Sequence, residues 1–173
     1  MGERVSARID TAGEGTANVA TGISVLDHLV GELAGTARIR LSLEVAPGTV
    51  EETVGASGQA LGEALAGPLR APGAEGRGWA WLPADEALAG AVIEISERPL
   101  LVSNVDFSGQ RVGGIGSDVI AQFLTAFAEG AGVNLHIRVL EGKDPQHVLH
   151  AIFKALGAAI GQACRLSEGG EAR

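Results

Sequence analysis

The stretch VNLHIRVLEGKDPQHVLHAIFKAL (residues 133–156) decides the fold expected for this chain. Apolar and polar residues alternate from Val133 to Leu140, which predicts a half-buried strand. Asp144 then stands where it can cap a helix whose first residue is Pro145, the helical position that proline prefers. The pattern therefore predicts a strand followed directly by a helix that continues through residues 147–163.

The first half of the chain shows the same order of elements. Residues 37–45 alternate as a strand would, and a helix is expected over 49–65, where Thr49 and Glu52 form a capping-box pattern. The Pro- and Gly-rich residues 67–78 break all periodicity between the halves. The remaining expected elements are amphipathic helices over 23–33 and 118–127 and early strands near 5–9 and 91–95.

This repeated order predicts an α+β fold: a single domain of two duplicated half-domains, residues 1–78 and 79–173. Each half is expected to be a small mixed sheet with helices on one face. Tyrosine is absent and there are only four Phe and two Trp, so the core must consist mainly of small aliphatic side chains. Such a core buries less area per residue, which favours additional burial by oligomerisation.

Composition and charge exclude several functions. The net charge of −8 is the wrong sign for a protein that binds the phosphate backbone, so no nucleic-acid partner is expected. No run of 18 apolar residues and no secretory-type segment occurs, which predicts a cytoplasmic protein without a membrane partner. A single cysteine, Cys164, allows neither an internal disulfide nor a cysteine-based zinc site.

The four histidines are the candidate functional residues. His147 and His150 lie three residues apart in the first turns of the last helix, so their side chains point to nearly the same side. His136 is on the preceding strand, and His28 is on the helix expected over 23–33 in the other half. Imidazole is the commonest metal-binding side chain, although such a pair also arises by chance and supplies only two ligands.

Four segments resemble the imidazoleglycerol-phosphate dehydratase family, and the resemblance covers nearly the whole chain. The family patterns are T-G-I-x-F-L-D-H-M, H-H-T-V-E-D, P-x-D-E-A-L, S-G-R-P and L-H-I, with a second H-H-x-x-E before A-x-F-K. The matching segments are TGISVLDHL (21–29), TVEETVGASGQALGEAL (49–65), LPADEALAGAVIEISERPLL (82–101) and NLHIRVLEGKDPQHVLHAIFKAL (134–156). The resemblance implies a duplicated fold like domain 2 of ribosomal protein S5, a large homo-oligomeric shell and a two-manganese site between subunits.

The chain departs from the family at the metal-binding motifs. Pro47 and Gly48 stand where the first motif has two histidines, although Glu51 keeps its carboxylate. In the second motif Gln146 replaces a histidine and His150 replaces the glutamate. The family's C-terminal phosphate-binding segment, S-T-K-G, has no counterpart.

All four histidines nevertheless fall on family ligand positions. By this resemblance we expect Glu51, His136 and His147 to hold one divalent metal, manganese by family, with His28 and His150 as a weakened second half-site. One ion rather than two is then the expected content. Two histidines and one carboxylate are an adequate ligand set for a divalent metal with open positions. As the family's sites lie between subunits, assembly and metal binding should be coupled.

Two further residues match the family's phosphate-binding positions: Arg98 in the S-x-R-P segment and Lys154 in F-K-A. A guanidinium fork suits a phosphate dianion and a lysine adds a point charge, although an ordinary salt bridge or a solvated position is the alternative for each. For Asp85 and Glu86, buried structural hydrogen bonding is expected.

The resemblance implies a lyase of histidine biosynthesis that removes water from a phosphorylated imidazole glycerol. The lost ligands predict altered or weak activity with the standard substrate. The alternative is a catalytically inactive paralogue that keeps the assembly and acts as a binding or regulatory protein.

Overall fold

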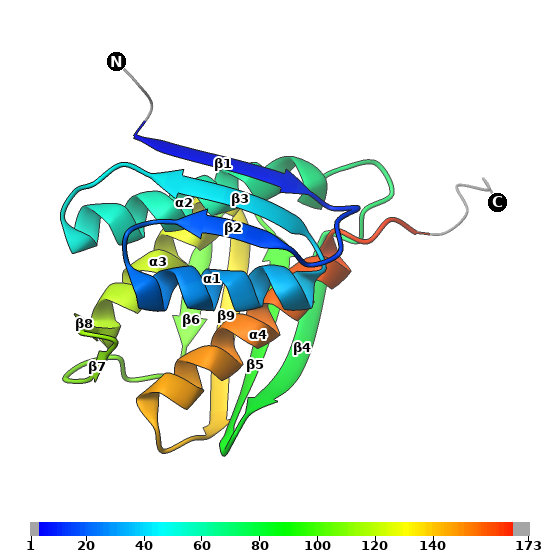
Figure 1. Cartoon of the computed structure of the whole chain (residues 1–173). Helices are drawn as coiled ribbons and strands as arrows, with labels where there is room; N and C mark the ends of the chain where they lie inside the picture. The colour runs from blue at the N-terminus through cyan, green and yellow to red at the C-terminus, as the bar shows by residue number, and fades with distance from the viewer. Residues whose placement is uncertain (1–3, 168–173) are drawn as a thin grey trace.

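The computed structural model describes residues 4–167 (Figure 1). In chain order its elements are β1 (Val5–Asp10), β2 (Ala17–Ala20), α1 (Ser24–Ala37), β3 (Arg40–Val45), α2 (Val50–Leu69), β4 (Arg77–Ala84), β5 (Ala87–Ile95), β6 (Leu100–Ser103), β7 (Arg111–Val112), β8 (Ile115–Gly116), α3 (Ser117–Ala131), β9 (Val133–Glu141) and α4 (Pro145–Ala163).

The two main sheets are built alike. In the first, of order β1-β3-β2, strand β3 is antiparallel to β1 and parallel to β2. In the second, of order β4-β5-β9-β6, strand β9 is antiparallel to β5 and parallel to β6. The β5-β9-β6 part thus repeats the order and directions of the first sheet, and β4 is an additional edge strand. That the halves 1–78 and 79–173 are pseudo-repeats stays a prediction, and its boundary falls inside β4.

The helices form two layers between the sheets (Figure 1). Helices α1 and α2 cover one face of the first sheet, α3 and α4 cover one face of the second, and the layers meet where α1 contacts α4 and α2 contacts α3. Leu43 on β3 and Leu135 on β9 are fully buried on the helix-facing sides. The expected α+β fold of small mixed sheets with helices on one face is therefore confirmed.

Local signals place the helix starts as expected. At α2 the Thr49 side chain accepts from the Glu52 backbone N–H, and the Glu52 carboxylate accepts from the Thr49 N–H, so the capping box is complete. At α4 the Asp144 side chain accepts from the backbone N–H of Gln146, and Pro145 is the first helical residue. These bonds satisfy N–H groups that have no partner within the helix.

Two expected segments were wrong in the kind of structure assigned to some of their residues. Residues 37–39 do not belong to a strand: α1 runs to Ala37, Arg38 is left-handed with φ 56°, and β3 begins only at Arg40. The stretch 67–78 is not wholly irregular, because α2 continues to Leu69 with Pro68 inside it. Proline's fixed φ is compatible with a helix, and near a C-terminus it disrupts little beyond the last turn.

The aromatic side chains divide between core and surface. Phe123, Phe127 and Phe153 are fully buried among aliphatic residues. Trp79 and Trp81 are 63% and 47% exposed on edge strand β4. Within residues 4–167, no helix is both long and apolar enough to cross a bilayer.

Candidate metal and substrate site

A pocket of about 380 Å³ lies beside the N-terminal half of α4, where that helix meets α1 and the β4–β5 turn. Predicted site residues His147, His150 and Lys154 line it, together with Glu32 and Asp85. A larger hollow of about 650 Å³ lies at the opposite, C-terminal ends of α1 and α4, and its lining contains other residues. The predicted chemistry therefore gathers in the smaller pocket.

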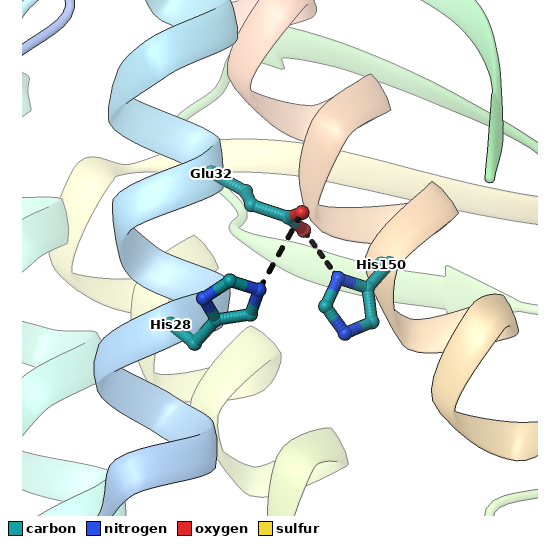
Figure 2. Close-up of side chains that lie close together, drawn as sticks. All are labelled: His28, Glu32 and His150. Carbon is teal, nitrogen blue, oxygen red and sulfur yellow. Dashed lines mark hydrogen bonds and ion pairs between the residues drawn. The ribbon is translucent and has the colours of Figure 1, made fainter.

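Glu32 joins two of the predicted histidines (Figure 2). Its Oε2 lies 2.7 Å from Nδ1 of His150, and its Oε1 lies 3.8 Å from Nε2 of His28. The two imidazole rings stand edge to face with their centroids 5.0 Å apart. His28 and Glu32 are one turn apart on α1, and His150 comes from α4. His28 and His150 therefore lie side by side, and their role as a metal half-site stays a prediction.

Glu32 was not among the residues that the sequence predicted. Its spacing of four residues from His28 places both side chains on one helix face, a signal that could have suggested it. This spacing does not predict the contact with His150, because His150 is 118 positions from Glu32 along the chain.

His147 is held by a different carboxylate. Its Nδ1 lies 2.6 Å from Oε2 of Glu86, whose Oε1 accepts from the backbone N–H groups of Asp144 (2.8 Å) and Lys143 (3.1 Å). These bonds, first that from Asp144 and then that from His147, lower the pKa of Glu86 to about 2. In return the Glu86 hydrogen bond raises the pKa of His147, although desolvation of the ring opposes this.

The expectation of burial for the two acidic residues of the β4–β5 turn was wrong. Asp85 is 75% exposed and has φ +50°, and Glu86 is 39% exposed. A tight turn between adjacent strands projects its side chains outward. The hydrogen bonding expected of Glu86 is present, and Asp85 reaches His147 as well, with Oδ2 3.4 Å from Nε2.

Lys154 lies one turn beyond His150 on α4 and lines the same pocket. Its Nζ donates a hydrogen bond of 2.6 Å to the carbonyl oxygen of Pro83 on β4. That bond fixes the ammonium at one wall of the pocket, where it can attract an anionic group.

The other three predicted residues lie away from this pocket. His136 is on β9 between Leu135 and Ile137, which face the helices, so its exposed side chain is on the outer face of the sheet. Glu51 is exposed in the first turn of α2, and Arg98 is exposed between β5 and β6. One chain therefore does not bring Glu51 or His136 to His147, and their meeting across subunits stays a prediction.

The side chains around the pocket fit a divalent metal. Imidazole nitrogens and carboxylate oxygens together suit first-row ions such as Mn²⁺, Fe²⁺ and Zn²⁺. His28, Glu32 and His150 offer ligand atoms that all lie within 4.8 Å of one another. Fold and pocket together define an α+β protein with a candidate site of imidazoles, carboxylates and one ammonium.

Comparison with known proteins identifies the family. The model of the imidazoleglycerol-phosphate dehydratase family matches residues 21–160. An imidazoleglycerol-phosphate dehydratase of Clostridium botulinum is 36% identical over 169 residues, 95% of this chain and 86% of that protein. Its counterpart in Desulfitobacterium hafniense is 39% identical over 169 residues, 94% of this chain and 85% of that protein. The chain therefore belongs to the imidazoleglycerol-phosphate dehydratase family.

Solved structures agree. The imidazoleglycerol-phosphate dehydratase of Staphylococcus aureus superposes with a TM-score of 0.86 and 26% identity, covering 94% of this chain and 95% of that one. The enzyme of Pyrococcus furiosus gives a TM-score of 0.78, also with 26% identity, over 97% of this chain and 92% of that one. The match extends over almost the whole fold, including α1 and α4.

Proposed function

We propose that this chain is a metal-dependent hydro-lyase that removes water from a phosphorylated imidazole glycerol in histidine biosynthesis, with activity altered by its changed ligand set. The observation that carries the proposal is the pocket itself. This chain belongs to the family, and His147, His150 and Lys154 line one pocket between α1, α4 and the β4–β5 turn. A cytoplasmic location follows from the same biosynthetic role.

The residues of the pocket can bind the substrate phosphate and a divalent ion. Lys154, held by Pro83, attracts the substrate phosphate, and Arg98 reaches the same group only if another subunit brings it near. His147, bonded to Glu86 through Nδ1, keeps a defined tautomer and presents Nε2 as the ring nitrogen that can bind an ion. A bound divalent metal would supply Lewis-acid stabilisation of the charge that develops on the substrate ring.

The remaining predicted ligands require assembly. Glu51 and His136 project from the first turn of α2 and from the outer face of the second sheet. We propose that copies of this chain associate in a large homo-oligomer in which these residues approach His147 of a neighbour and hold an ion, manganese by family. Sedimentation and metal analysis of His136→Ala should show a smaller assembly or the loss of this ion, and an unchanged assembly with unchanged metal content would refute this part.

A second candidate function is that of an inactive paralogue. It is favoured by Pro47 and Gly48, which offer no ligand atom from their side chains before α2. On this reading the chain keeps the family fold and the assembly, and it binds a partner or a ligand without turnover.

A turnover assay distinguishes the hydro-lyase from the inactive paralogue. Chelator-treated protein, reloaded with Mn²⁺, is incubated with imidazoleglycerol phosphate, and imidazoleacetol phosphate is measured as the enolisable ketone. We expect slow product formation that stops with chelator, and returns with Mn²⁺. Lys154→Met should raise KM more than it lowers kcat, because it removes the ammonium charge that attracts the substrate phosphate. No product from the fully loaded protein would leave the paralogue as the better description.

A further inference from the structure

The cluster of His28, Glu32 and His150 has the composition of a complete metal site within one chain. Two imidazoles and one carboxylate form a three-ligand set that leaves coordination positions open for water or a substrate atom. All three side chains come from α1 and α4, which pack directly against each other. Neither Glu51 nor His136 is needed to complete this set.

The distances suit an ion after small rotations. Ligand atoms that bind one metal at about 2.0–2.2 Å lie roughly 3 Å apart from each other. Glu32 Oε2 and His150 Nδ1 are already 2.7 Å apart, and His28 Nε2 lies 3.8 Å from Glu32 Oε1. The ring that is furthest away is also the freest to move, since the His28 side chain is 64% exposed and that of His150 only 14%.

Packing orients the two inner ligands. Thr36, one turn after Glu32, donates from Oγ1 to the backbone carbonyl of Lys154 at 2.8 Å, which ties α1 to α4 beside the cluster. Glu32 and His150 are thereby held at the helix–helix contact, and they also line the pocket that contains His147 and Lys154. An ion at the cluster would therefore border the space where a phosphorylated imidazole binds.

We propose that His28, Glu32 and His150 bind one divalent transition metal within a single chain, so that this ion does not depend on a second subunit. The proposal deepens the proposed function, on which it rests for the use of the ion. It assigns the carboxylate ligand to Glu32 on α1.

Metal affinity of stripped protein tests this assignment without any substrate. Mn²⁺, Co²⁺ and Zn²⁺ are titrated calorimetrically, and bound Co²⁺ is followed by its visible absorption. Glu32→Gln, which is nearly isosteric, should weaken binding at the cluster by about 100-fold or more, since removing only a group that supports a ligand costs 10–100-fold. Glu129→Gln, an exposed carboxylate on α3, is the matched control and should bind as the unaltered chain does.

Two further variants show whether a loss of metal reflects a lost ligand, a misfolded chain or a site that needs a second subunit. The exchange Glu32→His with His150→Glu keeps two imidazoles and one carboxylate, so it should bind more tightly than Glu32→Gln. His136→Ala, on the outer sheet face, should retain at least one ion per chain. Unaltered affinity in Glu32→Gln, or loss of all metal in His136→Ala, would overturn the proposal.

The turnover assay shows which proposal fails. If the loaded protein makes product while Glu32→Gln binds metal normally, the function stands and the assignment of Glu32 is wrong. If Glu32→Gln loses the ion and the loaded protein makes no product, the single-chain site stands and the dehydratase activity does not.

Discussion

Replacing Gly62 by alanine should destabilise the protein, although alanine is the better helix former. Gly62 lies on α2 where that helix meets α3. A Cβ added there would lie 2.6 Å from the backbone nitrogen of Ala131 and closer still to the carbonyl oxygen of Phe127. Because both neighbours are backbone atoms, neither can rotate away, and the two helices must move apart.

The magnitude follows from two opposing effects. Alanine gains about 1 kcal/mol of helix propensity over glycine, whereas overpacking a well-filled contact costs roughly 1–3 kcal/mol. With backbone on the other side of the contact we expect the upper end of that cost, a net loss of about 2 kcal/mol. Gly55, on the same helix, has open space at its Cβ position, so Gly55→Ala should instead gain about 0.5–1 kcal/mol.

Urea unfolding at a fixed protein concentration measures the difference. For a chain of this size a slope near 2 kcal/mol/M is expected, so the midpoints of the two variants should differ by about 1–1.5 M. If the two variants have the same free energy of unfolding, the close approach of α2 and α3 at Gly62 is refuted.

Other predictions concern the caps, the charges and the thiol. In metal-free protein Glu86→Gln should lower the pKa of His147, as measured by NMR. With Glu86 intact, the free energy of unfolding should fall as pH drops below 4.5 towards 2, because the Glu86 carboxylate becomes protonated there. It should also fall as pH rises above 6.5 through the raised pKa of His147, because the imidazole then loses its proton. Thr49→Ala should cost about 1 kcal/mol in urea unfolding, whereas Thr125→Ala, in an exposed mid-helix position, should not destabilise. Burial raises the pKa of Cys164 to about 11, so roughly one thiol in a thousand is ionised at pH 8, and native protein should react with a disulfide reagent far more slowly than unfolded protein.

The sequence predicted the helices and the central strands well, and its misses have physical causes. The helix starts at Thr49 and Asp144 were predictable, because each cap is a hydrogen bond between residues two or three apart. The short strands β2 and β6 were missed, since four residues are too few to show a period. Strand β4 was missed because Pro- and Gly-containing residues surround its two tryptophans.

The candidate site was predicted in part. His147, His150 and Lys154 share one face of α4, and the structure places all three at one pocket. Glu32 and Glu86, the carboxylates that hold the histidines, were not predicted as partners. Each pairing joins residues 61 or more positions apart, and no local pattern encodes such a distance.

By itself, then, the amino-acid sequence determined the helices, the central strands and the family, because periodicity and capping act over a few residues. Tertiary structure decided which charges face each other. Small residues let α1 approach α4, with Gly157 set against Leu33 and Thr36, and that approach brings Glu32 to His150. The same packing places His136 on the opposite side of the second sheet, away from the pocket, because side chains alternate along a strand and its neighbours Leu135 and Ile137 occupy the helix-facing side.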